Sequence, residues 1–589
     1  MKIFEANISF KVADYLHNSL QNIGEIETAN QEIYKAFGFI DFFECDEDLE
    51  ILKKFVSNPI NIVSDQDRAE YGDFQTNNNL ADKITAQLKS QNVSPQIVIE
   101  PTCGKGNFII ASLKKFESIE KIYAVEIYKP YVWECKFNII DFYLENRKRI
   151  KPSISIVHKS IFDFDFKNIA KQNSEKEILV IGNPPWVTNS KLGSLNSENL
   201  PQKNNFKKHS GIDAITGKGN FDIAEFISIM LIETFQNHSG NMAFLVKNSV
   251  IKNLVYDQKQ NKYAISELEK YTIDSKKEFN VSVEASLFCC KFNSHPQLVC
   301  QEYDLYNNDK QILSFGWKNE KFVSNIELYS DNFKIDGTSP FIWRQGLKHD
   351  CSSIMELERV NGHFVNGLDE KITLESDLVY GLLKSSDLKS KVVTNSRKYT
   401  IVTQKKVGQE TNYIKYDFPQ TFEYLSSHTN LFNARKSSIY KNKPPFSIFG
   451  VGDYSFKPFK IAISGLYKTF HFSLVLPNNG KPLMLDDTCY LIGFDNIDFA
   501  VFCTILLNSQ ENKEFLQSIT FPDSKRTFTK DVLMRIDLYE LSELIPNVEL
   551  EEELKNINKE YQLNVSLERW KDFQNEMSPM QNGQMQLFT

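Results

Sequence analysis

One tetrapeptide, Asn183-Pro184-Pro185-Trp186, combines residue types that could carry chemistry. It follows Ile178–Gly182, an apolar run that predicts a buried parallel strand because it does not alternate with polar residues. Side chains at the carboxyl end of such a strand lie where open α/β sheets bind their ligands. The prolines hold nearby carbonyl groups as rigid acceptors, and the asparagine and tryptophan add an amide oxygen and a flat ring. The combination suits an exocyclic amino group on a planar base, whereas the structural alternative is a strand that simply ends in a proline turn.

A glycine loop follows an earlier predicted strand. The strand Ile97–Glu100 leads into a loop with Gly104 and Gly106, and a helix is predicted over Phe108–Phe116. Glycines permit a tight turn and a close approach of backbone to a ligand. The loop lacks the third glycine of dinucleotide-binding loops and the Gly-Lys-Ser/Thr of triphosphate-binding loops, so neither ligand is favoured. The acid that ends the strand, Glu100, suits a cationic group.

Further strands complete an alternating pattern. Lys121–Glu126 ends in an acid about 20 residues beyond the glycine loop, where such side chains accept hydrogen bonds from ribose hydroxyls. An ordinary solvated strand end is the alternative for Glu126. Ser153–His158 is a third strand candidate, and the strand before Asn183 is the fourth. The alternation of strands and helices predicts an α/β fold with a doubly wound, mostly parallel, Rossmann-like sheet.

Together these segments resemble the gamma group of S-adenosylmethionine-dependent amino-DNA methyltransferases, in which the cofactor motifs precede a DNA-recognition domain. Residues 100–108 are similar to the family's cofactor loop, and Glu126 is similar to its ribose-binding acid. Residues 183–186 resemble the catalytic tetrapeptide in the form usual for adenine N6. Residues 71–76 resemble the segment that closes over the methionine end of the cofactor, with Asn77 where the family usually has proline.

The resemblance implies two sets of site residues. The catalytic set is Asn183, Pro184, Pro185, Trp186 and Phe279, the last as the aromatic residue on the far side of the target base. The cofactor set is Tyr71, Thr76, Glu100, Pro101, Gly104, Gly106, Phe108, Glu126, Ser160, Ile161, Asp163 and Asn183. Ser160 and Asp163 stay alternatives for the contact to the cofactor's adenine amino group. Residues 219–226 resemble the family's next helix, which helps to wall the cofactor pocket.

Length and resemblance predict several domains. A chain of 589 residues with 41% hydrophobic content can bury large cores in two or more domains. We expect an N-terminal helical segment (1–65), a methyltransferase domain (66–330) and a mixed α/β target-recognition domain (335–545). A C-terminal helical segment (546–589) follows and is acidic over Val548–Lys555.

Composition argues against several classes of protein. The nine cysteines lack metal-ligand spacing, so no metal is expected. The N-terminus lacks the order of a signal peptide and no apolar run is long enough for a bilayer, which favours a cytoplasmic protein without a membrane partner. The net charge of −8 does not favour a polyanion, so DNA contact requires local basic surface.

The predicted recognition domain contains such basic clusters, interleaved with aromatic and hydroxyl residues. The clusters are Arg344–His349, Arg397–Tyr399, Lys405–Lys406, Arg435–Lys441, Lys457–Lys460 and Lys525–Arg526. The mixture suits contacts to phosphates and base edges, and scattered solvated charge is the alternative. Within this domain Phe446–Tyr454 predicts a strand, a turn and a second strand.

The function implied is methyl transfer from S-adenosylmethionine to adenine N6 of a base flipped out of double-stranded DNA. Such an enzyme is typical of the protective arm of a restriction-modification system, so a separate restriction endonuclease is a candidate partner. Transfer to cytosine N4 is an alternative, as is a DNA-binding defence subunit that senses the cofactor without catalysis. Protein glutamine methyltransferases share the Asn-Pro-Pro core but are much shorter.

Overall fold

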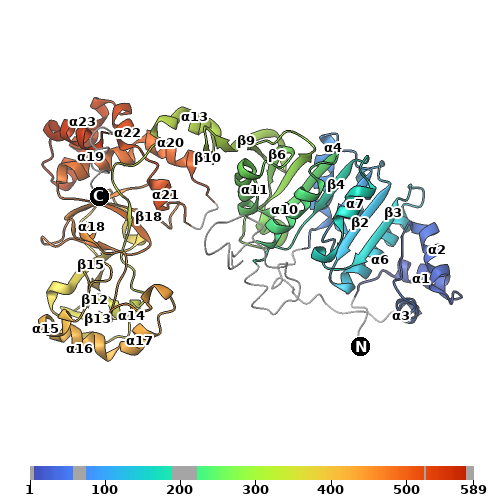
Figure 1. Ribbon diagram of the computed structural model, residues 1–589, viewed down its shortest axis with the longest axis horizontal. Coiled ribbons are helices and arrows are strands. Elements are labelled where there is room, and N and C mark those ends of the chain that lie inside the picture. Colours follow the sequence, from blue (N-terminus) through green and yellow to red (C-terminus); the bar gives the residue numbers. More distant parts are fainter. Residues whose placement is uncertain (1–5, 58–74, 189–221, 523–525, 579–589) are drawn as a thin grey trace. The chain divides into compact units, whose positions relative to one another are not determined.

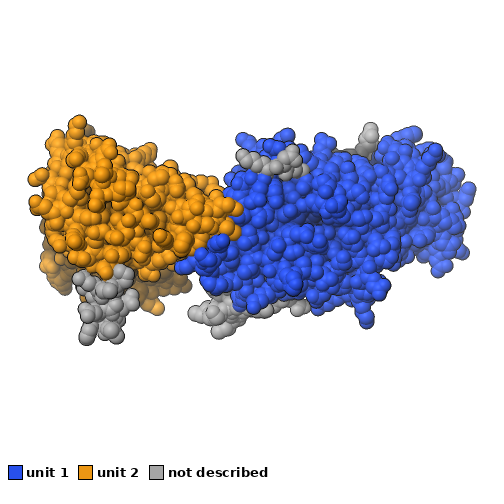
Figure 2. All heavy atoms as spheres, turned by 90° about the horizontal axis from the view of Figure 1, so that it is seen from above, with its two compact units in different colours: residues 1–322 blue, residues 323–589 orange. Residues whose placement is uncertain are grey.

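The chain forms two compact units, Met1–Phe322 and Val323–Thr589, which Figure 2 shows in different colours. The computed structural model describes residues 6–57, 75–188, 222–522 and 526–578. The segments predicted over 1–65 and most of 66–330 therefore share the first unit, and those over 335–545 and 546–589 share the second. The functional roles assigned to these four ranges remain predictions.

The first unit alternates helices and strands, as Figure 1 shows. Its strands are β1 Ile97–Glu100, β2 Lys121–Glu126, β3 Ser153–His158, β4 Ile178–Gly182, β5 Gly240–Lys247, β6 Ile265–Thr272, β7 Ala285–Phe292, β8 Val299–Asp304, β9 Asn307–Lys318 and β10 Lys321–Val323, the last of which reaches into the second unit. Its helices are α1 Phe10–Leu20, α2 Ile26–Phe37, α3 Asp46–Ser57, α4 Asn78–Ser90, α5 Asn107–Lys115, α6 Lys129–Glu145, α7 Phe166–Gln172, α10 Ile223–Phe235, α11 Asn248–Asn261 and α12 Ser275–Phe279.

These strands form one mostly parallel sheet, which confirms the predicted Rossmann-like fold class. Within the described residues its order is β10-β9-β8-β6-β7-β5-β4-β1-β2-β3. The five strands from β3 to β5 are mutually parallel, and β7 runs antiparallel to both β5 and β6. β1 and β4 are buried along their whole length, because helices cover both faces of a parallel sheet.

After β1 the chain adds strands on one side of β1, and it later adds further strands on the other side. It proceeds from β1 through α5 and α6 to β3, and then returns to β4, next to β1. Crossovers between parallel strands are right-handed. Helices that connect strands on one side of β1 therefore cover one face of the sheet, and those that connect strands on the other side cover the opposite face. The gap between β1 and β4 is thus the topological switch point, where open sheets bind their ligands.

The segment between α2 and α3 continues the sheet beyond β3. Phe39 forms a parallel bridge with Ile154 of β3, and the N–H of Ile40 donates to the Ile154 carbonyl at 2.7 Å. The Ile154 N–H in turn donates to the Gly38 carbonyl at 2.8 Å. Phe42 packs edge-on against Trp133 of α6, with ring centroids 5.5 Å apart. The segment from α1 to α3 is therefore an integral part of the first unit.

The second unit contains two smaller sheets. Its strands are β11 Arg344–Gln345, β12 Glu356–Val360, β13 His363–Asn366, β14 Lys371–Ile372, β15 Val379–Leu383, β16 Val392–Val393, β17 Lys398–Ile401, β18 Phe459–Ser464, β19 Ser473–Val475, β20 Met484–Leu485 and β21 Cys489–Phe494. Its helices are α13 Ile326–Asn332, α14 Ser352–Met355, α15 Tyr413–Asp417, α16 Pro419–Ser427, α17 Thr429–Asn433, α18 Asp453–Phe456, α19 Ile497–Asn508, α20 Gln510–Ile519, α21 Lys530–Leu533, α22 Leu538–Leu544, α23 Asn547–Tyr561 and α24 Trp570–Met577.

Each sheet has a main core of its own, and a further apolar cluster contains residues of both sheets, among them Leu383 of β15 and Ala462 of β18. Among the described residues five strands pair in the order β11-β21-β18-β19-β16, and six pair in the order β14-β13-β12-β17-β15-β20. Helices α19 to α24 share an apolar core with the five-stranded sheet, in which Phe502, Phe515 and Phe573 are fully buried. Residues 351–357 and 414–448 contribute to a separate core around the six-stranded sheet. We call residues 347–451, which supply every strand of the six-stranded sheet except β20, the six-stranded lobe.

Two sequence predictions in this unit were wrong. Phe446–Tyr454 is not a strand, a turn and a strand, because Phe446 and Ile448 pack into a core from an irregular segment and Asp453–Phe456 forms α18. Lys460 is not surface charge. It lies on β18, the central strand of the five-stranded sheet, is 1% exposed, and donates to the Lys457 carbonyl at 2.7 Å.

Replacing this buried amine should change the pH dependence of stability. Burial lowers the pKa of Lys460 from 10.5 to about 7. Between these values the unfolded chain binds the proton and the folded chain does not, so the unfolding free energy rises with pH across that window. We expect the unfolding free energy of the wild type, relative to Lys460→Met, to increase from pH 7 to pH 9 in urea titrations. A difference that stays constant with pH would contradict this assignment.

Candidate active site

Asn183 lies at the carboxyl end of β4, beside the switch point. β4 pairs with β1 and β5, so the tetrapeptide emerges next to the loop that follows Glu100. The side-chain nitrogen of Asn183 donates to the hydroxyl oxygen of Thr76 at 3.2 Å. The Thr102 hydroxyl donates to the Asn183 carbonyl at 3.5 Å. Because the amide nitrogen of Asn183 points to Thr76, its amide oxygen points to the other side.

Trp186 and Phe279 contact each other directly. Their ring centroids are 5.1 Å apart with an interplanar angle of 72°, an edge-to-face arrangement. Trp186 is 6% exposed, and its indole nitrogen donates to the Leu245 carbonyl of β5 at 3.2 Å. A base sandwiched between two rings needs about 3.5 Å on each side. The two rings therefore contact each other and have to separate before a base can enter between them, and the role of Phe279 beside a target base stays a prediction.

The glycine loop has the left-handed backbone that only glycine adopts easily. Gly104 has φ +50° and Gly106 has φ +83°, and Gly106 directly precedes α5. A Cβ atom on Gly106 would overlap the sulfur of Cys135 on α6. Phe108, in the first turn of α5, is 2% exposed and belongs to the core. Both glycines are thus required by local geometry before any ligand is considered.

Two acids flank this loop. Glu126, at the end of β2, accepts hydrogen bonds from the N–H groups of Gly104 at 2.9 Å and Tyr128 at 2.8 Å. Glu100, at the end of β1, is 2% exposed, and one of its carboxyl oxygens has no hydrogen-bond partner among the described residues. Burial, and next the neighbouring Cys135, raise the pKa of Glu100 well above its usual range. A cation at this position would offset that cost and favour the charged form.

A short turn follows β3. The Ser160 hydroxyl accepts a hydrogen bond from the N–H of Phe162 at 3.2 Å and caps a 3-10 turn over Ile161–Asp163. Ile161 is 5% exposed, whereas the Asp163 side chain is exposed. The Phe162 ring meets Phe226 of α10 edge-on at 5.7 Å. Ser160 and Asp163 thus remain alternatives for a contact to the adenine of a cofactor.

Residues 75–77 link the parts of this site in a way that sequence reasoning missed. The Gln75 side-chain oxygen accepts from the N–H of Lys105 in the glycine loop at 3.3 Å. The Thr76 carbonyl accepts from the side chain of Asn107 at 2.6 Å, in addition to the contact of Thr76 with Asn183. The one available signal was Asn77 in place of the proline that the resemblance leads us to expect.

The remaining predicted positions lie partly outside the described residues. Tyr71 lies outside them, as do residues 219–221. Asp222 caps the first turn of α10 and forms an ion pair with Lys247 at 2.5 Å, at the carboxyl end of β5. Pro101 lies next to β4, since a Cβ atom on Gly182 would be 3.6 Å from its ring. The described part of the chain contains no cluster of three or more side chains arranged to hold a metal.

The basic clusters of the second unit differ in what surrounds them. Arg397 pairs with Asp387, Lys398 with Glu356 and Glu358, and Lys457 with Asp495. Lys405, Lys406 and Lys436 are exposed and form no ion pair with any residue that the structure describes. The cluster Lys525–Arg526 lies partly outside the described ranges, and Arg526 donates to the Asp487 carbonyl at 3.4 Å.

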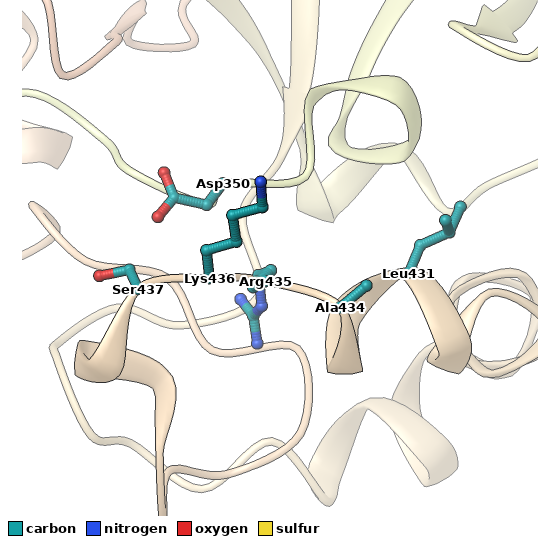
Figure 3. A pocket seen from close by; sticks show the side chains of 6 residues that line it. All are labelled: Asp350, Leu431, Ala434, Arg435, Lys436 and Ser437. Carbon is teal, nitrogen blue, oxygen red and sulfur yellow. The ribbon is translucent and has the colours of Figure 1, made fainter. Parts of the chain in front are cut away.

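Arg435 and Lys436 have opposite roles. Arg435 donates to the carbonyls of Phe432 at 3.0 Å and Ser447 at 2.8 Å, and lies 3.7 Å over the Tyr440 ring. Lys436 points away from it and, with Asp350, lines an open pocket of about 600 Å³ (Figure 3). Arg435 therefore holds the loop together, and Lys436 is the cation available to a ligand.

Comparison with known proteins gives one extensive match. Type II methyltransferase M.NspV of Nostoc sp. (strain ATCC 29411 / PCC 7524) is 40% identical over 492 residues, which span 81% of this chain and 98% of that protein. No protein-family model matches the chain.

Similarity to solved structures is weaker. The Type IIL restriction-modification enzyme MmeI in complex with DNA aligns at 11% identity and a TM-score of 0.46, over 85% of this chain and 75% of that one. The type I restriction enzyme EcoKI M protein aligns at 11% identity and a TM-score of 0.27, over 50% of this chain and 64% of that one.

The sheet order defines a doubly wound, Rossmann-like fold, with the tetrapeptide at the carboxyl end of β4 beside the switch point. The extent of the match to M.NspV shows that the chain belongs to the Type II methyltransferases, the DNA methyltransferases of restriction-modification systems.

The geometry of the glycine loop can be tested through stability. Gly106→Ala forces a side chain into a left-handed conformation and against Cys135, so we expect the unfolding free energy to fall by about 1–3 kcal/mol. Cys135→Ala in the same background removes the overlap but leaves φ at +83°, and should restore only part of the loss in urea unfolding. Full stability in Gly106→Ala would show that the loop does not require glycine.

Proposed function

We propose that this protein transfers a methyl group from S-adenosylmethionine to the N6 atom of adenine in double-stranded DNA. The observation that carries the proposal is the orientation of Asn183 at the carboxyl end of β4, with its amide nitrogen donating to Thr76. This orientation leaves the amide oxygen as the group that accepts a hydrogen bond from a base amino group. The adjoining prolines keep the Pro184 carbonyl rigid as a second acceptor.

The target amine is a poor nucleophile because its lone pair is delocalised into the ring. The Asn183 oxygen and the Pro184 carbonyl accept its two hydrogens and support the positive charge that develops on nitrogen. Because N6 is paired and stacked inside a duplex, the base has to be extruded, at a cost of a few kcal/mol. Stacking on Trp186 and Phe279 offsets that cost by roughly 1–3 kcal/mol per base.

The residues around the glycine loop fit a cationic nucleoside cofactor. When bound, S-adenosylmethionine supplies the electrophilic methyl group. The loop glycines let backbone approach the ligand, and Glu126 accepts from its ribose hydroxyls. The buried Glu100 carboxyl, one oxygen of which lacks a partner among the described residues, faces a cost of burial that a cation offsets. Thr76, Pro101, Phe108, Ile161 and either Ser160 or Asp163 complete the proposed pocket, with Tyr71 from the segment outside the described residues.

DNA is proposed to lie on two adjoining loops of the six-stranded lobe. The Thr403 hydroxyl donates to the Phe446 carbonyl at 2.8 Å, and the Thr411 hydroxyl donates to the Pro445 carbonyl at 2.7 Å. These bonds hold the loop that bears Lys405 and Lys406 beside the segment that follows Lys436. Cations on adjoining loops suit contacts to consecutive phosphates, which fix the position of a protein on a duplex.

Transfer of tritium from labelled S-adenosylmethionine to phage λ DNA tests the proposal. Nucleoside analysis of the product should give N6-methyladenine. Recovery of N4-methylcytosine would assign the label to the chemically similar cytosine amine instead, and the absence of label in DNA would favour a subunit that only senses the cofactor. Sequencing of the modified DNA then locates the methylated site, which is the sequence that a partner restriction endonuclease would share.

Removing the proposed acceptor should abolish transfer. We expect Asn183→Ala to reduce kcat by at least about a hundredfold, the usual effect of removing a preorganised group from a charged transition state. The dissociation constant for S-adenosylmethionine, measured by calorimetry, should change little, because the amide oxygen faces the base. A kcat within about tenfold of the wild type, little more than one weak contact, would overturn the proposed mechanism.

Removing the exposed cations should reduce the salt dependence of DNA binding. For the triple variant Lys405→Ala, Lys406→Ala and Lys436→Ala we expect the slope of log K against log salt to fall by about 0.9 per lost phosphate contact. The matched control removes the ion-paired Arg397, Lys398 and Lys457, with the same change in net charge. Equal slopes for the two triple variants in fluorescence anisotropy would place the DNA surface elsewhere.

A further inference from the structure

The side chain of Asn77 makes contacts in two directions. Its oxygen accepts from the N–H of Leu80 at 2.9 Å and so caps α4. Its nitrogen donates to a carboxylate oxygen of Glu278 at 2.7 Å, across 201 positions of sequence. Since Thr76 contacts Asn183 and Gln75 contacts the glycine loop, Asn77 connects these neighbours to α12.

Glu278 directly precedes Phe279 on α12. The other carboxylate oxygen of Glu278 accepts from the Tyr306 hydroxyl at 2.6 Å, so two side chains hold this carboxylate. α12 has only five residues, and a helix this short depends on tertiary contacts for its position. The Asn77–Glu278 bond is thus one of the contacts that determine where the Phe279 ring lies.

The position of Phe279 matters because its ring closes on Trp186. At 5.1 Å between centroids the two rings leave no space for a base, so the Phe279 ring has to move when a base enters, by rotation of its side chain or by a shift of α12. Any shift of α12 is transmitted to Glu278, and through it to the segment that contacts the glycine loop and Asn183. Proline, which the resemblance leads us to expect at this position, has no side-chain donor, so the connection belongs to this chain's own sequence.

We propose that Asn77 is a positioning residue that couples cofactor occupancy to the grip on the target base, through its hydrogen bond to Glu278 beside Phe279. The inference rests on the proposed function, which assigns the glycine loop to the cofactor and Phe279 to the base. By thermodynamic linkage, a cofactor that orders residues 75–77 should strengthen base binding, and a flipped base should strengthen cofactor binding by the same factor.

The test exchanges the two hydrogen-bonding partners. Asn77→Asp retains the helix cap, since aspartate caps as well as asparagine, but places a carboxylate against Glu278. Glu278→Gln in the same background restores a donor opposite the new acceptor and leaves an oxygen for Tyr306. Asn79→Asp is the matched control, because it adds the same charge to the same turn of α4. Asn79 is exposed, and the hydrogen bond to Glu278 comes from Asn77.

The readout is the ratio of DNA dissociation constants without and with S-adenosylhomocysteine. The duplex carries the site methylated in phage λ DNA, with 2-aminopurine at the target position, whose fluorescence reports extrusion. We expect a ratio of at least about fivefold for the wild type and for Asn79→Asp, within the usual range of coupling. The ratio should fall toward one in Asn77→Asp and recover in the double variant, and KM for DNA should rise more than kcat falls.

Three results would overturn the coupling. They are a wild-type ratio of one, an Asn77→Asp ratio equal to that of the wild type, and no recovery when Glu278→Gln is added. Failure of the proposed function has a different signature, because the wild-type chain would then form no N6-methyladenine in DNA. Loss of coupling with wild-type transfer intact therefore separates the two proposals.

Discussion

Every part of the candidate site depends on the reversal of strand order between β1 and β4. Because the chain leaves β1 on one side and returns on the other, two loops from distant parts of the sequence emerge at one edge with no strand between them. One loop carries the glycines and Glu100, and the other carries Asn183 and the prolines. Under the proposed function, a cofactor on the first loop and a base on the second are thereby held next to each other, and such positioning supplies much of the rate advantage.

The electrostatics of this edge are unfavourable until a ligand arrives. Glu100 is buried beside Cys135 and in the field of Glu126, and all of these raise the pKa of its carboxyl group. Glu126 is better compensated, because backbone N–H groups of Gly104 and Tyr128 donate to it. Around the same loop, Glu126 is thus stabilised by hydrogen bonds, whereas the buried carboxyl group of Glu100 costs free energy. Costly buried groups of this kind are more typical of functional sites than of structural cores.

The sequence predicted the strands well because their signal is local. All four predicted strands formed with the predicted bounds as β1 to β4, and the family resemblance explained the order of their loops. The contact between Thr76 and Asn183 spans 107 positions and has no local signature. The sequence also could not distinguish buried from exposed lysines. Lys460 is buried in a central strand, whereas Lys436 is exposed on a loop. Their environments follow from tertiary packing, as does the irregular segment around Phe446, whose apolar spacing reflects core contacts and not strand pairing.

The bridge between Phe39 and Ile154 bears on how the chain avoids aggregation during translation. An edge strand with open N–H and carbonyl groups is a template on which a second chain can pair and aggregate. Here residues 38–40 occupy that edge on β3, and they are made before β3 itself. Because domains tend to fold from the N-terminus during translation, the cover for the vulnerable edge already exists when the strand leaves the ribosome. Residues 38–40, between the first helices, are thus a built-in protection of this edge against pairing with a second chain.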